Sequence, residues 1–173
     1  DDGHIPCAKR TGGSGQGVAM CMKGLDGGRI NSATCWVGTA EQAIVDETAD
    51  VKDRQQFNSA ISEFQNTQFQ IADMLTELVA SRQMIRLAAS KLDNGDPNAS
   101  TYCAMAKRFA TDAGFNVCND ALQLFGGYGY IREYPMERYV RDTRVHQILE
   151  GTNEIMRVII SRQALMDGAL EVI

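Results

Sequence analysis

The segment most suggestive of chemistry begins the last apolar stretch of the chain, where Glu150 and Gly151 precede Thr152. The helical spacing after Thr152 predicts a helix, whose first turn would offer unpaired N–H groups and the positive end of its dipole. Such an end suits a phosphate or thioester oxygen, and the glycine would let a ligand approach closely. The same residues also fit a structural role, with Glu150 as a solvated loop acid and Thr152 as an N-cap. Spacing alone favours that structural role.

Other site chemistries find little support in the residues. The sequence contains no HExxH, GxSxG or EF-hand motif, and its two histidines are His4 and His146. It also lacks the paired Glu-x-x-His of a di-iron bundle. The glycine-rich run at 12–17 matches neither GxGxxG nor a P-loop and is typical of a turn. We therefore expect no metal site.

Length and composition favour one globular domain. The chain has 173 residues, of which 44% are apolar and 23% charged. A net charge of −5 without a basic run argues against binding to nucleic acid or an anionic membrane. No apolar run approaches the roughly 18 residues of a membrane span.

The cysteines bear on the compartment. There are five and no CxxC pair, which argues against a disulfide framework or a zinc site and predicts buried thiols in a reducing compartment. We expect the cytoplasm, with the mitochondrial matrix as the alternative. Because the chain starts at Asp1 without a signal-like segment, we expect a fragment of a longer protein.

Helical spacing dominates the elements that must position these residues. Apolar residues recur every three to four positions from about Val18 to Asp53, from Phe64 to Ile85, and from about Asn98 to Leu122. The stop signal Asn94–Pro97 separates the second helix from the third.

The remaining chain completes the expected fold. The run 125–130 is expected to be a loop, Pro135 to start a short helix, and 152–170 to form the last helix. Long amphipathic helices with short connections predict an all-α, antiparallel four-helix bundle over residues 17–173.

Several motifs in one order resemble those of the acyl-CoA dehydrogenase family. The stretch His146–Glu154 resembles the family signature and is closest to its isobutyryl-CoA (short- or branched-chain) branch. Asp26–Arg29 resembles the segment that lines the acyl-CoA channel. Arg54–Phe57 resembles the Arg-x-x-Phe that reaches the flavin pyrophosphate of a neighbouring subunit, and Gln65 falls at a glutamine that contacts the same cofactor. Gln123–Gly127 resembles the Gln-x-x-Gly-Gly loop at the adenosine half of FAD.

The resemblance implies an FAD-dependent desaturation of a short or branched acyl-CoA. Glu150 would be the base that takes the α-proton, and the β-hydrogen would leave as hydride to the flavin. Some members place the base near residues 26–28 instead, but here the signature position already holds Glu150. Asp26, Arg29 and Gly151 would contact the substrate. The implied cofactor-binding residues are Arg54, Phe57, Gln65, Gln123, Gly126, Gly127, Thr152, Asn153 and Glu154.

The resemblance also implies partners and a domain context. It implies a homodimer or homotetramer and an electron-transfer flavoprotein as acceptor. It runs from about Thr11 to the end, with residues 1–16 as a remnant of a preceding β-domain or a linker. Asn58–Ile61 replaces the glycine and proline-containing turn that is usual in the family. The alternative is a stand-alone helical oligomerisation module without flavin or activity.

Overall fold

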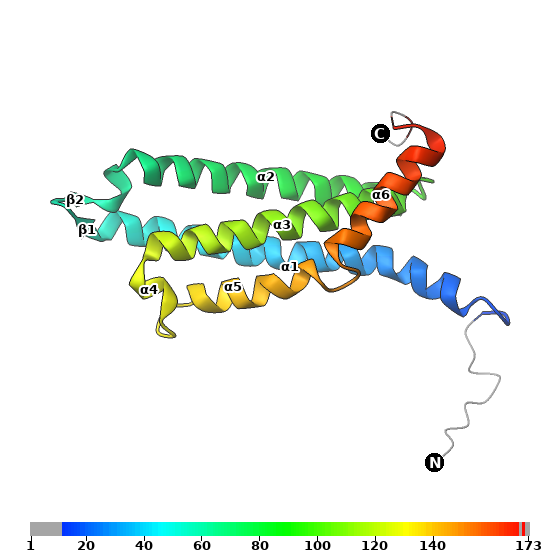
Figure 1. Cartoon of the computed structure of the whole chain (residues 1–173), viewed down its shortest axis with the longest axis horizontal. Helices are drawn as coiled ribbons and strands as arrows, with labels where there is room; N and C mark the ends of the chain where they lie inside the picture. Colours follow the sequence, from blue (N-terminus) through cyan, green and yellow to red (C-terminus); the bar gives the residue numbers. More distant parts are fainter. Residues whose placement is uncertain (1–11, 170, 172–173) are drawn as a thin grey trace, which may run out of the picture.

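Three long helices lie side by side and form most of the molecule (Figure 1). The computed structural model describes residues 12–169 and 171. The long helices are α1 (Gly17–Asp53), α2 (Gln65–Asp93) and α3 (Ala99–Phe125). The predominance of helices among the described residues confirms the predicted all-α fold class. Most of the expected segment 1–16 lies outside the described residues, and positions 12–16 form bends and a turn.

A small hairpin joins α1 to α2. It consists of β1 (Gln55–Gln56) and β2 (Ser59–Ala60), paired antiparallel, and is followed by the short helix η2 (Ile61–Glu63). Phe57 and Asn58 form its two-residue turn with φ values of 53° and 65°. Two positive φ values in succession match the twist of a two-residue hairpin. The chain therefore enters α2 through a hairpin at the positions where Asn58–Ile61 departs from the resemblance.

The last helix forms nearly where it was expected, at α6 (Asn153–Asp167), but another helix takes the fourth side of the bundle. Here α5 (Met136–Arg144) packs along α3 and α1. After η3 (Val145–Gln147) and a loop, α6 (Asn153–Asp167) crosses α3 near the end of the bundle (Figure 1). The fourth side of the bundle is thus formed by α5, which packs against α3 and α1, whereas α6 crosses the end of α3.

The expected loop at 125–130 is wrong in part. The helix α3 continues to Phe125, and a single helical turn, α4 (Gly127–Tyr130), follows. Gly126 separates the two with φ 60° and ψ −138°, a conformation that is essentially limited to glycine. Gly126 alone therefore interrupts the helix, whereas the whole run 125–130 was expected to be non-helical.

Among the described helices, none combines the length and apolar character required for a membrane span.

The described cysteines differ in exposure. Cys103 and Cys118 are buried, but Cys21 and Cys35 are exposed. The expectation of buried thiols is therefore confirmed for Cys103 and Cys118 and wrong for the two cysteines on α1, while Cys7 lies outside the described residues.

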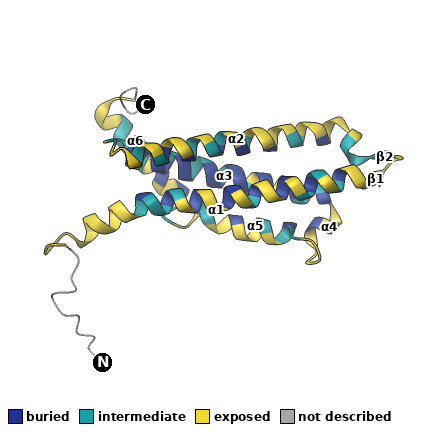
Figure 2. Ribbon diagram, turned by 180° about the vertical axis from the view of Figure 1, so that it is seen from behind, coloured by how far each residue is buried: buried dark blue, intermediate teal, exposed yellow. Residues whose placement is uncertain are grey.

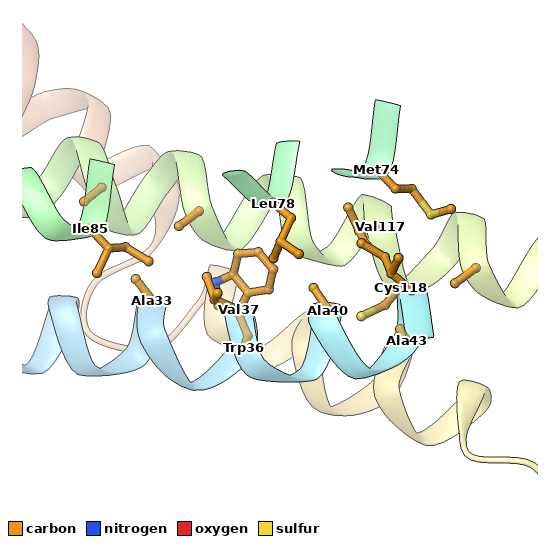
Figure 3. Close-up of a cluster of buried hydrophobic side chains, with 14 of the residues drawn as sticks. Ala33, Trp36, Val37, Ala40, Ala43, Met74, Leu78, Ile85, Val117 and Cys118 are labelled. Atoms are coloured by element: carbon orange, nitrogen blue, oxygen red, sulfur yellow. The ribbon is translucent and has the colours of Figure 1, made fainter. Parts of the chain in front are cut away.

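The core is centred on α3, which is the most buried of the long helices (Figure 2). Trp36 of α1 is 1% exposed and lies in the space left by the missing side chain of Gly114 on α3. Figure 3 shows the surrounding side chains, which come from α1, α2 and α3: Ala33, Val37, Ala40, Ala43, Met74, Leu78, Ile85, Val117 and Cys118.

Gly114→Ala should destabilise the bundle strongly. A Cβ built at Gly114 would lie 1.4 Å from Cζ3 of Trp36, so the two helices would have to separate. We expect a loss of about 3 kcal/mol in the free energy of unfolding, measured by denaturant titration. Gly38→Ala is the matched control on α1, because its Cβ would meet nothing within 4 Å. Equal stability of the two variants would contradict this packing.

Glu47 of α1 is a buried carboxyl whose ionisation opposes folding. It is 0% exposed, and neither carboxylate oxygen has a hydrogen-bond partner of normal geometry in the part of the chain that the structure describes. Burial, and secondarily the charge of Asp50, raise its pKa from 4.5 to about 7. The folded protein therefore holds the Glu47 proton more tightly than the unfolded chain does.

Glu47→Gln should remove a pH dependence of stability. Because the folded pKa is the higher one, the contribution of the Glu47 carboxyl is intact below pH 4.5 and is lost as the pH rises through 7. The loss is about 3 kcal/mol at most. We expect the variant to match the parent at about pH 4 and to exceed it in unfolding free energy at about pH 8. Parallel pH profiles of the two proteins would contradict this.

Candidate functional site

Glu150 lies in the loop before α6 and rests against α1. Its backbone is left-handed with φ 57°, and Gly151 follows with φ 91°. A Cβ built at Gly28 would lie 2.5 Å from Oε2 of Glu150. The carboxylate therefore occupies the space that a side chain at Gly28 would fill, and Glu150 is half-buried there. A carboxylate held in this way is partly desolvated and has a fixed position, as a general base requires.

The expected substrate residues Asp26 and Arg29 lie at the same place. They form a buried ion pair with 2.7 Å between Arg29 Nη1 and Asp26 Oδ1. The hydroxyl of Ser100 on α3 donates to the other oxygen of Asp26. Arg29 Nε also donates to the backbone oxygen of Glu150 at 3.4 Å. The pair thus ties α1 to both α3 and the loop that carries Glu150.

Lys107 is a member of this site that the sequence analysis did not identify. It lies on α3, is 0% exposed, and donates from Nζ to Gly151 O at 2.7 Å and to Asn153 Oδ1 at 2.8 Å. Burial lowers its pKa from 10.5 to about 8. No local signal distinguishes it, because a single lysine in a helix is normally exposed.

The start of α6 uses its polar side chains in different ways. Thr152 is the N-cap and accepts from the backbone N–H of Ile155 at 3.4 Å. Asn153 is buried, and its amide nitrogen donates to Asp112 Oδ1 at 2.7 Å and to Thr111 Oγ1 at 2.9 Å. Glu154 is exposed. Of the three expected cofactor residues here, Asn153 therefore directs its side chain into the protein.

His146 joins the segment before Glu150 to α1. Its Nδ1 lies 2.9 Å from the hydroxyl oxygen of Ser32. Burial, and then the charge of Lys107, lower the pKa of His146 from its usual value. No group of three His, Cys, Asp or Glu side chains that could hold a metal ion occurs among the described residues.

A second group of expected site residues surrounds Arg54. Arg54 Nε donates to Asp50 Oδ2 at 2.9 Å, and its Nη2 donates to the backbone oxygen of Leu124. A Cβ at Gly126 would lie 3.9 Å from Arg54 Nη1. The exposed residues of this group are Phe57, Gln65, Gln123, Gly126 and Gly127.

The two groups lie at different ends of the bundle. Lys107 of α3 contacts the loop of Glu150, whereas Leu124 of α3 contacts Arg54. At 1.5 Å per residue these positions are about 25 Å apart along the helix. The hairpin and α4 accordingly lie at the end opposite to α6 (Figure 1). The chain does not unite all the expected residues in one site.

The family model, the sequence relatives and the similar solved structures all point to one family. The family model for the acyl-CoA dehydrogenase C-terminal domain matches residues 15–165. The mitochondrial isobutyryl-CoA dehydrogenase of Bos taurus is 52% identical over 96% of this chain and 40% of its own length. The structure of butyryl-CoA dehydrogenase from Megasphaera elsdenii has a TM-score of 0.90 and 39% identity over 93% of this chain and 42% of that one.

A third similar structure is that of PigA with FAD and proline. It has a TM-score of 0.91 and 30% identity, and the match covers 97% of this chain and 44% of that chain. The chain spans about 40% of the length of the isobutyryl-CoA dehydrogenase that it matches.

Proposed function

The chain belongs to the acyl-CoA dehydrogenase family, and from this premise we propose that it works as the C-terminal domain of an FAD-dependent enzyme that desaturates a short or branched acyl-CoA. The main support for the proposal is the position of the Glu150 carboxylate, which fills the space that a side chain at Gly28 would occupy. The 52% identity to an isobutyryl-CoA dehydrogenase supports the substrate class.

Glu150 serves as the base that removes the α-proton of the thioester. The α C–H bond gives its proton to a carboxylate oxygen, the β C–H bond gives a hydride, and a C=C bond forms between the two carbons. Bound FAD would supply the hydride acceptor. Gly151 lies against the thioester carbonyl, where the lack of a side chain permits close approach. Ile148 and Leu149, both about half exposed, offer apolar surface beside the base for the acyl chain.

Asp26 and Arg29 act on the substrate indirectly. Their charged groups form a buried ion pair with each other. Arg29 Nε also donates a hydrogen bond to the backbone oxygen of Glu150. They thereby fix the wall of the acyl-CoA site and the base within it.

The cofactor residues serve two flavins. Thr152, Glu154 and the backbone of Asn153 lie next to Glu150 and contact the FAD at that site. Arg54, Phe57, Gln65, Gln123, Gly126 and Gly127 lie at the other end of the bundle and contact the FAD of a neighbouring copy. The separation of about 25 Å along α3 supports this division.

The division requires a homo-oligomer, either a dimer or a tetramer. Large apolar side chains are exposed along the outer face of α2, which supports contact with another copy. They are Phe69, Leu75, Val79 and Leu87. An electron-transfer flavoprotein is the acceptor that family membership implies. The enzyme works in the cytoplasm or the mitochondrial matrix.

Flavin content and turnover test the proposal. The full-length protein that carries this domain should purify yellow and reduce an electron-accepting dye with isobutyryl-CoA or butyryl-CoA. The 173-residue chain by itself should bind little FAD, because its described residues form a helical domain without the β-domain that the resemblance places before it. A colourless full-length protein that ignores added FAD and acyl-CoA would contradict the proposal and favour the oligomerisation module.

A further inference from the structure

We propose that Lys107 is a positioning residue that holds Glu150 in its left-handed conformation over Gly28. The inference rests on the proposed role of Glu150 as the base. It starts from a feature that the chemistry above does not use, a fully buried ammonium group beneath the loop that carries the base.

The loop conformation needs contacts from outside. A residue with a Cβ is unfavourable at φ 57°, and such a conformation persists only where the surroundings impose it. Two consecutive carbonyls of the loop are held by buried cations. Arg29 Nε donates to Glu150 O at 3.4 Å, and Lys107 Nζ donates to Gly151 O at 2.7 Å. The shorter bond is the one made by Lys107.

Lys107 also fixes the far side of the loop. Its second hydrogen bond goes to Asn153 Oδ1 at 2.8 Å, at the first residue of α6. Asn153 is itself anchored to α3 through Thr111 and Asp112. One ammonium group therefore ties the carbonyl after Glu150 and the start of α6 to the same helix, which restrains the loop at both points.

Packing alone does not account for a lysine here. A buried cation is costly in free energy, and a methionine side chain of similar length would fill the same space. The free-energy cost of burying the Lys107 ammonium group indicates that its hydrogen bonds serve a function. Both bonds described for Lys107 end on the segment that places Glu150.

Lys107→Met in the full-length enzyme tests the proposal kinetically. A misplacement of the base by about 1 Å should lower kcat per bound flavin by about 10²-fold. KM should change by less than about threefold, since ground-state binding is preserved. Val117→Ala is the matched control. It lies in the core of the same helix and should lower the melting temperature while leaving kcat per flavin unchanged. A merely structural role for Lys107 would make the two variants behave alike.

NMR of the 173-residue chain tests the proposal without turnover. The ¹³Cα shifts of Glu150 and Gly151 report their backbone conformation, and they should move in Lys107→Met and stay in place in Val117→Ala. If Lys107→Met does not fold, Lys107→Gln goes through both measurements, because its amide is shorter and uncharged but keeps N–H donors.

The outcomes separate the two claims. Unchanged shifts at Glu150 and Gly151, or an unchanged kcat per flavin in an active enzyme, would overturn the role of Lys107. An inactive parent enzyme would instead defeat the proposed function, and the NMR result would then decide alone whether Lys107 holds the loop.

Discussion

Glu150→Gln is expected to leave the fold intact and to lower kcat of the full-length enzyme by about 10⁴-fold. The amide has nearly the same shape as the carboxylate, so it can occupy the space over Gly28, but it cannot accept the α-proton. The measurement is steady-state dye reduction with isobutyryl-CoA, normalised to bound flavin. Circular dichroism and flavin content should match those of the parent protein.

The matched control is Glu133→Gln. Glu133 is an exposed carboxylate before α5, and its replacement makes the same chemical change away from the proposed base. Its turnover should equal that of the parent. Turnover of Glu150→Gln within about tenfold of the parent would show that another group takes the proton.

Gly28→Ala is expected to lower kcat by about 10²-fold. The new Cβ would lie 2.5 Å from Oε2 of Glu150, so the carboxylate must move while the helix itself tolerates alanine well. The loss should appear in kcat per bound flavin, with normal thermal stability. Gly24→Ala is the control one turn earlier in α1, because its Cβ would meet nothing within 4 Å.

Combining the two substitutions tests whether they act on one group. If Gly28→Ala acts only by displacing Glu150, it should cause no further loss in a Glu150→Gln background, because residues that share one task are non-additive. Independent, additive losses would mean that Gly28 contributes to catalysis in another way, for example by direct contact with the substrate.

The helices were largely predictable because their signals are local. The apolar spacing of α1 and the stop signal Asn94–Pro97 placed two long helices nearly as observed. After α3, the short helix that follows Pro135 and the last helix were also expected and are found, but how they pack was not predictable in the same way. One conformation at Gly126 sets where α3 ends, and tertiary packing sets α5 rather than α6 along the bundle.

The site residues were predictable only where they belong to a recognisable sequence motif. The signature around Glu150 identified the proposed base, and Asp26–Arg29 identified the part of α1 beside it. Lys107 gave no signal, because its function depends on a loop more than forty residues away in sequence. The burial of the Asn153 side chain has the same cause, since its partners Thr111 and Asp112 lie on α3.

The most direct test of the central claim is a crystal structure of the full-length protein with FAD and an acyl-CoA analogue that cannot be desaturated. We predict that a carboxylate oxygen of Glu150 lies within about 3.5 Å of the α-carbon, with the thioester beside Gly151 and Gly28. A thioester bound elsewhere, with the Glu150 carboxylate turned toward bulk water, would contradict the account.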